Sequence, residues 1–523
     1  MKKFVEAPPS PPEPAEQKRE RPSFAAPLVA LSGMLALILC VLFMAAPMTR
    51  LAGTPVSALI PDGSILVHAG SWLPRNLHIA SDAYSNRIGT GNVEFLLLMA
   101  IAFGVYGVCA LLTQLFLRRS TRRGILALIW LGAIVAGLIF LLTPALLSHD
   151  LFVYAGYGRL MDAYHANPYF VPLSAYRHDP IYPLDDWGTY TAAYGPLWMV
   201  VCSIVSFIAG AHPLRYILLF RLLGLLAHLV NIQLVFLILR KMERSPRTVI
   251  LGTMLYAWNP LVLLESSQGA HNDIFMITFI LLGIFFLVQV EKETAMRWRS
   301  ALLPTVALTL AALVKYTTIP LVALAIIMLV FRALRADTSG SHKAREMIAR
   351  LWKPALLVGL TGCITSGIVI LAFYGPFFFG HSFRAIVDSF TNPPSSRGSH
   401  KSILDAIVLQ LTHSPPPPHS GLHALLSRLS SPKLWDLINI ITLAGGIIIG
   451  AIWLWRKPTT RTFVLASLLT LGAFLLVAPW FLPWYATWLV ALAAVSLTVS
   501  RSPVARGLVA FALTFSASVF ILY

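Results

Sequence analysis

Long apolar runs separated by short polar segments extend along nearly the whole chain of 523 residues. A helix needs about 20 apolar residues to cross the hydrocarbon core of a bilayer, which is about 30 Å thick. Barrel strands would instead be short and alternate between apolar and polar residues. The pattern therefore predicts an all-α polytopic membrane protein. Its thirteen predicted transmembrane helices lie near residues 25–47, 93–117, 124–147, 214–239, 248–265, 274–290, 300–314, 317–331, 354–375, 434–455, 462–477, 481–499 and 507–522.

The run at 195–210 (GPLWMVVCSIVSFIAG) is shorter than most of the others. If it crossed the membrane, the basic segment 240–247 would lie outside and the later basic loops would be inverted. We therefore interpret it as a re-entrant or juxtamembrane helix on the outer side, because Lys and Arg collect in cytoplasmic loops. The segments then predicted to lie inside are 1–24, 118–123, 240–247, 291–299, 332–353, 456–461 and 500–506.

The distribution of charge supports this topology. The inner segments hold 27 of the 40 Lys and Arg residues and 9 of the 22 Asp and Glu residues, and the rest of the chain carries equal numbers of each sign. The net charge of +18 is therefore a feature of the cytoplasmic side, and it requires no nucleic-acid partner. The N-terminus is predicted to lie inside and the C-terminus outside.

The topology divides the chain into five parts. Residues 1–24 are rich in proline and charge, which predicts a disordered cytoplasmic tail. Residues 25–123 would form two N-terminal transmembrane helices with an outer loop, and 124–375 a transmembrane core with its outer loop 148–194. Residues 376–433 would form a proline-rich outer loop, where HSPPPPH prevents a continuous helix. Residues 434–523 would form the C-terminal transmembrane helices.

Ionisable and aromatic side chains gather at the predicted outer ends of these helices. Ionisable groups at membrane depth are costly, so we treat them as candidate functional residues. Simpler roles also fit: the tryptophans suit an interfacial belt, Lys315 could reach the headgroups, and Asp150 could cap a helix. We expect Asp162 and Asp179 to be solvated surface acids. The candidates are His149, Asp150, Arg215, Arg221, His271, Asn272, Asp273, Lys315, Trp484 and Tyr485.

Acids beside cations at a lipid boundary suit transfer from a phosphate-linked lipid. A carboxylate within hydrogen-bond reach can take the proton from an attacking hydroxyl. Lysine and arginine can offset the charge on a departing phosphate, most effectively where water is scarce. Aromatic faces suit sugar rings and a polyprenyl chain. These features are compatible with an enzyme, but they do not by themselves distinguish it from other lipid-binding proteins.

Several short motifs follow one another along the chain. They are Asp150, Tyr154 and Gly158 in SHDLFVYAGYGRL, Asn167-Pro168-Tyr169, Tyr194-Gly195-Pro196-Leu197, GAHND at 269–273, Lys315, and Trp484-Tyr485. Their order and their common side of the membrane resemble the glycosyltransferase C superfamily. More narrowly, the chain is similar to bacterial polyprenol-phosphate-mannose-dependent mannosyltransferases of the glycosyltransferase family 87 type. The resemblance covers roughly residues 124–500.

The resemblance implies an integral enzyme of the bacterial plasma membrane. Such an enzyme transfers one sugar, mannose in these relatives, from a polyprenyl-phosphate donor to a glycan or glycolipid acceptor at the outer face, with inversion. Its catalytic acid matches Asp150, which would be the general base, while Asp273 and His271 would orient the acceptor or the base. The implied substrate-binding residues are His149, Tyr154, Arg159, Asn167, Tyr169, Tyr194, Asn272, Trp484 and Tyr485, with Lys315, Arg221 and Arg215 near the donor phosphate.

A cofactor is not required for this reaction, because side chains can neutralise a one-phosphate leaving group, although the clustered His and Asp are compatible with a divalent cation. Two other functions fit the pattern. A lipid flippase or other transporter would need polar groups along a path through the bilayer. His228 and Asn231 lie mid-span, but helix–helix hydrogen bonds explain them adequately. An outer-face polysaccharide ligase or polymerase would also use lipid-linked donors.

Overall fold

In the computed structural model, the described residues are 25–51, 90–117, 122–242, 245–293, 297–335, 344–391, 401–497 and 502–523. The secondary-structure elements among these residues are α-helices and 3-10 helices, with no extended strand, so the predicted all-α class is confirmed. The predicted tail 1–24 and most of the loop between the first two predicted spans lie outside the described residues.

Ten helices of the described chain are long and apolar enough to cross a membrane. The prediction of many spanning helices therefore holds for the described residues. The ten are α1 (Ala25–Leu51), α3 (Thr90–Phe116), α4 (Arg122–Leu142), α7 (Pro213–Met242), α10 (Asn272–Glu291), α12 (Ile319–Ala333, with the 3-10 turn η6, Tyr316–Thr318), α13 (Ala344–Phe378), α17 (Pro432–Arg456), α18 (Thr460–Val477) and α20 (Pro503–Ser518, with η10, Val519–Leu522).

The remaining predicted spans correspond to bent or shorter helices. α8 (Pro246–Ala257) and α9 (Pro260–Ser267) meet at 50° and would form an eleventh span if counted together. η5 (Trp298–Ala301) with α11 (Leu302–Val314), and η8 (Pro483–Tyr485) with α19 (Ala486–Ser496), are apolar but shorter than a full span. α6 (Pro196–Ala209) has 14 residues, as short as the run at 195–210 suggested.

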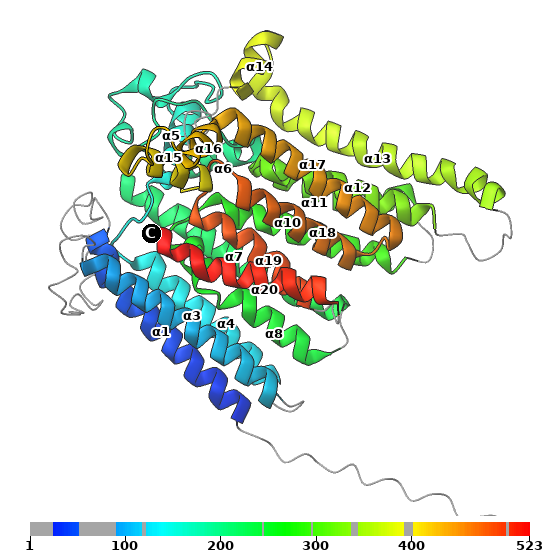
Figure 1. Cartoon of the computed structure of the whole chain (residues 1–523), viewed down its shortest axis with the longest axis horizontal. Helices are drawn as coiled ribbons and strands as arrows, with labels where there is room; N and C mark the ends of the chain where they lie inside the picture. Colours follow the sequence, from blue (N-terminus) through cyan, green and yellow to red (C-terminus); the bar gives the residue numbers. More distant parts are fainter. Residues whose placement is uncertain are drawn as a thin grey trace, which may run out of the picture.

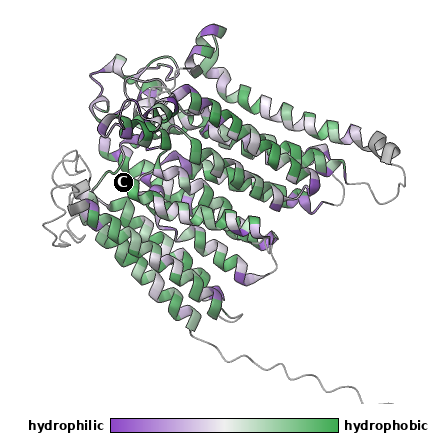
Figure 2. Ribbon diagram, in the orientation of Figure 1, coloured by the Kyte–Doolittle hydropathy of each residue, from purple (hydrophilic) through white to green (hydrophobic). Residues whose placement is uncertain are grey.

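The helices form an elongated bundle (Figure 1). α1, α3 and α4 pack together at one flank, while α13 lies at the opposite flank against α11 and α12. Apolar residues cover most of the helical surface, and polar residues collect towards helix ends (Figure 2). Leu371 of α13 and Ile440 of α17 are 71% and 65% exposed. Such apolar outward faces are expected of helices that contact lipid.

Shorter elements gather at one end of the bundle. The predicted outer loop 148–194 holds α5 (Asp150–Asp162), η3 (Leu173–Tyr176) and η4 (Tyr182–Leu184), and the segment 376–433 holds α14 (Phe383–Thr391), α15 (Ile403–His413) and α16 (Gly421–Leu429). Ser402 and Ser420 cap α15 and α16 by accepting backbone N–H bonds, both at 3.1 Å. In Figure 1, α5, α15 and α16 lie together at the end where α17 begins.

Two glycines allow backbones to approach closely near this end. A Cβ on Gly224 of α7 would overlap the carbonyl oxygen of Ser266 in α9. A Cβ on Gly195, just before α6, would overlap the carbonyl oxygen of Leu313 in α11. Only glycine fits such contacts without a backbone shift. The glycines therefore bring the ends of α9 and α11 into the region where α5 begins.

The mid-span polar residues bind neighbouring helices. Nε2 of His228 lies 3.2 Å from the carbonyl oxygen of Ala257. The amide of Asn231 donates to the Tyr256 hydroxyl at 3.0 Å and to the carbonyl of Ile274 at 2.9 Å. The predicted helix–helix hydrogen bonds are therefore confirmed, and they link α7 to α8 and α10.

A candidate active site at one end of the bundle

The ends of four helices, α5, α9, α10 and α11, meet at one end of the bundle. Asp150 starts α5, Glu265 lies in the last turn of α9, and Asp273 lies in the first turn of α10. His271 directly precedes α10, and Lys315 directly follows α11. Three acids, a histidine and a lysine from distant parts of the sequence thus form one cluster.

His271 links two of these acids. Its Nδ1 lies 3.6 Å from Oδ2 of Asp150, and its Nε2 lies 3.2 Å from Oε2 of Glu265. Its ring stacks on Trp484, with centroids 3.7 Å apart and planes inclined by 12°. Burial disfavours the charged imidazolium, but the carboxylates of Glu265 and Asp150 outweigh burial and raise the pKa of His271 above its usual 6.5. The two acids thus favour the charged form of the His271 imidazole that lies between them.

The turn before His271 fixes this arrangement. Ala270 has a φ of 55°, a left-handed conformation that is strained for a residue with a Cβ. The N–H of His271 donates to the carbonyl of Glu265 at 3.2 Å. A Cβ on Gly269 would overlap the Glu265 carboxylate and lie 2.7 Å from the imidazole. Backbone strain is thus located where an acid and a histidine are brought together.

A second buried ion pair joins α10 to α11. Nζ of Lys315 lies 2.8 Å from Oδ1 of Asp273, and the indole N–H of Trp488 donates to the same oxygen at 2.6 Å. The ammonium also lies 4.0 Å from the centre of the Tyr485 ring, where a cation–π contact is favourable. Burial lowers the pKa of Lys315, and the Asp273 carboxylate opposes that decrease. The ion pair and Trp488 together connect α10, α11 and α19 through buried side chains.

Asp150 is the most accessible acid of the cluster. Its side chain is 15% exposed, compared with 2% for Glu265 and none for Asp273. Beside the cluster, both polar atoms of the Asn272 amide and Oδ2 of Asp273 are buried without a hydrogen-bond partner among the described residues. Buried polar atoms are usually paired in folded proteins. The hydroxyl groups of a sugar could bind to such atoms.

The loop 148–194 adds a further acid to this region. The Asp185 carboxylate packs against α5, where a Cβ on Gly156 would lie 2.7 Å from Oδ2. Burial and the charges of Asp186 and Asp150 raise the pKa of Asp185 to about 7, although the N–H of Trp187 donates to this carboxylate at 2.9 Å and lowers it. Asp185 therefore titrates near neutral pH beside the first turns of α5.

The same loop contacts two other predicted site regions. Nδ1 of His149 lies 3.2 Å from Oδ2 of Asp186. The rings of Trp187 and Trp480 have centroids 5.4 Å apart, so the loop touches the turn that carries Trp484. The beginning of α5 is therefore enclosed by residues from both halves of the chain.

Tyrosines surround the Lys315 side of the cluster. Tyr154 meets Tyr194 edge to face at 5.6 Å, and the Lys315 ammonium lies 5.8 Å from the Tyr194 ring centre. The hydroxyls of Tyr169 and Tyr316 both donate to the Tyr194 carbonyl, at 2.9 and 3.0 Å. These contacts bring the predicted residues Tyr154, Tyr169 and Tyr194 into one aromatic layer.

Asn167 holds the loop against α13. Its Oδ1 accepts the N–H of Tyr169 at 3.1 Å, and its amide nitrogen donates to the carbonyl of Phe377. Tyr169 packs edge to face on Phe377, with centroids 5.3 Å apart. The Asn-Pro-Tyr motif thus fixes the loop on a neighbouring helix.

The three predicted substrate-binding arginines have other surroundings. Arg221 is fully buried, and its nitrogens donate to four backbone carbonyls, those of Leu141, Thr143, Ala145 and Gln268. Arg159 pairs with Asp179 at 2.7 Å. Arg215 is exposed in the first turn of α7. Arg221 and Arg159 therefore bind partners within the protein.

The expectation that Asp179 is a solvated acid is wrong. Its side chain is fully buried, and it accepts bonds from Arg159, from the Tyr164 hydroxyl at 2.9 Å and from the N–H of Ile181 at 2.9 Å. A buried carboxylate with three donors is satisfied in the folded state. Asp179 therefore holds the loop 148–194 together.

Sequence reasoning missed several residues of this region. Glu265 is an acid within an apolar segment, and its membrane depth was a signal that could have found it. Lys401, from the segment 376–433, lies at the border of this region: its ammonium donates to the carbonyl of Leu522, burial lowers its pKa, and the charge of Glu265 opposes the decrease. The spacing of Lys401, Asp185 and Trp488 gives no indication of their place near the cluster. In the part of the chain that the structure describes, no three His, Cys, Asp or Glu side chains are grouped to hold a metal ion.

The fold and this cluster define a polytopic membrane protein with a buried acid–histidine–lysine site at one end of its helices. A family model described as alpha-(1->6)-mannopyranosyltransferase, N-terminal domain, matches residues 50–332, more than half of the chain. Alpha-(1->6)-mannopyranosyltransferase A of Mycobacterium tuberculosis is 26% identical over 409 residues, which are 71% of this chain and 69% of that protein. No solved structure matches. The chain belongs to this mannosyltransferase family.

Family membership confirms the resemblance found in the sequence and shows that the protein is a membrane glycosyltransferase. It favours an enzyme over a transporter. Asp150, Glu265, His271, Asp273 and Lys315 all lie within the matched region 50–332.

Proposed function

We propose that the protein transfers a single mannosyl residue from a polyprenyl-phosphate donor to a glycan or glycolipid acceptor at the outer face of the membrane. The observation that supports this most is the position of Asp150. It is the most accessible acid of the cluster, and it lies beside a histidine whose pKa is raised by a second, buried acid. A carboxylate in such a place can accept a proton without being enclosed by protein.

In the proposed reaction, an acceptor hydroxyl attacks the anomeric carbon from the side opposite the phosphate. The new C–O bond forms as the bond to the phosphate oxygen breaks, and the hydroxyl proton moves to the Asp150 carboxylate. Polyprenyl phosphate leaves with the electron pair of the broken bond. Inversion at a beta-linked donor would give an alpha product, and we propose the alpha-(1->6) linkage for which the relative is named.

We assign the departing phosphate to the lysine side of the cluster. Lys315 has three ammonium hydrogens, and one of them binds Asp273. We do not assign Arg221 to the phosphate, because its nitrogens bind backbone carbonyls. A lysine beside a single phosphate is compatible with a reaction that needs no metal ion.

The aromatic residues would hold the sugar and the lipid. Trp484 stacks on His271, and Tyr485 lies beside Lys315, so both rings border the proposed base and the proposed phosphate position. Aromatic faces suit the apolar faces of sugar rings and a polyprenyl chain. The predicted residues Tyr154 and Tyr194 would contribute to the same surface.

The test is mannosyl transfer by membranes supplied with a panel of polyprenyl-phosphate sugars, followed by mass analysis of the products. Asp150→Asn should lower the rate by about 10² to 10⁴ fold, the usual contribution of a general base. Asp162→Asn is the matched control, because Asp162 ends the same helix and lies outside the cluster. It should keep the rate close to that of the unaltered protein.

Three outcomes would contradict parts of the proposal. Full transfer by Asp150→Asn would exclude it as the base. If none of the polyprenyl-monophosphate sugars serves as a donor, the proposed donor class is excluded. Products extended by blocks of sugars instead of one sugar would indicate a polymerase. Loss of activity with a chelator, restored by a divalent cation, would show that a metal takes part.

A further inference from the structure

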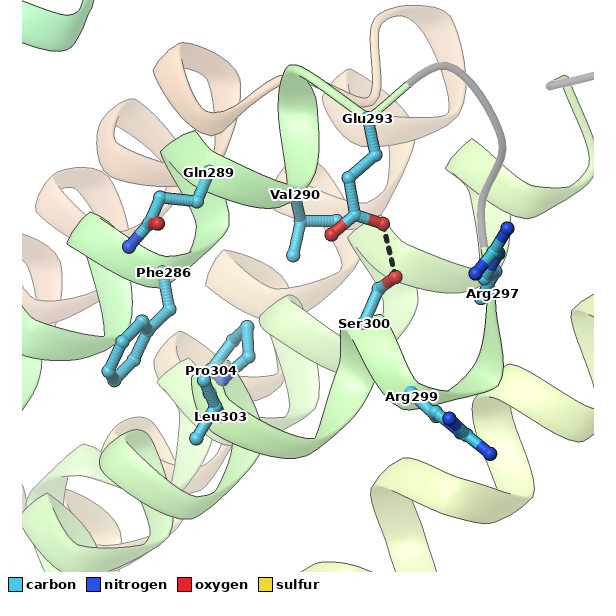
Figure 3. Close-up of a pocket in the computed structure, with 9 residues that line it drawn as sticks. All are labelled: Phe286, Gln289, Val290, Glu293, Arg297, Arg299, Ser300, Leu303 and Pro304. Carbon is cyan, nitrogen blue, oxygen red and sulfur yellow. Dashed lines mark hydrogen bonds between the residues drawn. The ribbon is translucent and has the colours of Figure 1, made fainter.

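A pocket lies at the end of the bundle opposite to the acid–histidine cluster. α10 begins at the cluster and ends at Glu291, about 30 Å away for a helix of 20 residues. The pocket has a volume of about 490 Å³ and lies where α10 ends and α11 begins (Figure 3). Phe286, Leu303 and Pro304 line its apolar part, whereas Arg297 and Arg299 follow the end of α10. One end of the pocket is therefore apolar and the other is cationic.

A second hollow adjoins the first. Its volume is about 570 Å³, and it shares Arg297 and Arg299 with the first pocket. Trp298 and the beginning of the α13 span, with Lys353 and Leu357, complete its lining. The two arginines thus stand between two hollows on the same membrane face, and a third cation faces them from another helix.

The cations outnumber the acids here. The carboxylate of Glu293 accepts a hydrogen bond from the Ser300 hydroxyl (Figure 3). Of the described residues, none forms an ion pair with Arg297, Arg299 or Lys353. Three positive charges that have no ion-pair partner among the described residues, beside one carboxylate, favour an anionic ligand. Arg297 and Arg299 can each give two parallel N–H bonds to a phosphate.

Apolar residues surround this charged region. Trp298 is 43% exposed, Leu303 57%, Trp352 47% and Leu357 50%. Arg299 lies over the Trp298 ring at 5.3 Å, which places a cation beside an interfacial aromatic group. A free phosphate ion would leave the apolar surface without a partner. A lipid would place its phosphate at the cations and its acyl chains along the exposed helix faces.

We propose that these two hollows bind the head group of an anionic diacyl phospholipid. The phosphate would lie between Arg297 and Arg299, with Lys353 adding charge from α13. A zwitterionic head group is less suitable, because its ammonium would bring a further positive charge beside three cations. The charge distribution of the sequence predicts that this end faces the cytoplasm, where anionic lipids give the membrane surface a negative potential.

Native mass spectrometry of the purified full chain would test this site. The protein is titrated separately with phosphatidylglycerol, with phosphatidylcholine of the same acyl chains, and with inorganic phosphate. We expect the unaltered protein to bind phosphatidylglycerol more tightly than phosphatidylcholine. Each basic residue near a membrane surface contributes about fivefold in affinity, so Arg297→Gln/Arg299→Gln should weaken phosphatidylglycerol binding by about 10- to 30-fold.

The matched control is Arg428→Gln/Lys433→Gln, which removes two exposed cations near the other end of the bundle. It should keep the preference for phosphatidylglycerol. Arg297→Lys/Arg299→Lys keeps the charge and should lose only part of the affinity, which separates charge recognition from a loss of folding. Equal binding of both lipids, an unchanged affinity in the glutamine variant, or equally tight binding of inorganic phosphate would overturn the proposal.

Discussion

Replacing Lys315 alone should destabilise the protein more than replacing Lys315 and Asp273 together. The two side chains are 10% and 0% exposed, and their charged atoms are 2.8 Å apart. Lys315→Met would leave a fully buried carboxylate with one strong donor, the indole N–H of Trp488. Breaking a buried ion pair in this way costs about 3–5 kcal/mol, because the remaining charge is uncompensated.

The double variant Lys315→Met/Asp273→Asn has no buried charge at this position. Its asparagine carbonyl can still accept the N–H of Trp488, so we expect the loss of stability to shrink to about 1–2 kcal/mol. Both variants should lose transfer activity if Lys315 binds the donor phosphate. Stability and activity therefore respond differently to the second substitution.

Thermal unfolding in detergent at one fixed scan rate would measure the difference. With an unfolding entropy of about 2.1 cal/mol/K per residue, 1 kcal/mol corresponds to about 1 °C for a chain of this length. Lys315→Met should then lower Tm by about 3–5 °C, and the added Asp273→Asn should restore most of it. Lys433→Met, at an exposed position in α17, should leave Tm unchanged. A double variant no more stable than Lys315→Met would refute the argument.

Three further predictions follow from the same region. Glu265→Gln removes a carboxylate that raises the pKa of His271. The decline of transfer activity at alkaline pH should therefore begin at a lower pH than in the unaltered protein. An unchanged pH profile would contradict a role of Glu265 in setting the pKa of His271. Asp185 has a pKa raised from 3.8 to about 7, so the folded state keeps a proton between about pH 4 and 7 that the unfolded chain releases. Stability should therefore fall as pH rises through that window, by up to about 4 kcal/mol, and unfolding of Asp185→Asn should lack this dependence. In Arg221→Lys, the lysine cannot donate to all four carbonyls that Arg221 binds. The free energy of unfolding, measured by thermal unfolding, should therefore fall by about 2–4 kcal/mol. A variant as stable as the unaltered protein would exclude a structural role for Arg221.

Much of the fold could be predicted because transmembrane helices have a simple signal. Apolar length alone located the long spans and showed that 195–210 is shorter than most of them. The cluster was also partly predictable, since Asp150, His271, Asp273 and Lys315 stand out as ionisable groups at helix ends. Family membership independently supports the enzyme class.

The pairing of these residues could not be predicted, because it depends on three-dimensional packing. The turn that brings His271 next to Glu265 contains Ala270 at a positive φ, and no local sequence motif predicts that turn. Arg221 looks like a phosphate ligand in the sequence, but its partners are backbone carbonyls on two other segments. Asp179 looks solvated until the loop 148–194 folds over it.

The bond between Asp273 and Trp488 has a consequence for how the protein is made. Lys315 is synthesised 42 residues after Asp273, and Trp488 is synthesised 215 residues after it. While the chain is being inserted into the membrane, the Asp273 carboxylate has no partner until Lys315 and then Trp488 have been synthesised. The candidate site thus becomes complete only when one of the last helices, α19, has docked against α10. A chain that stops early can carry every acid of the site and still lack the surroundings in which they work.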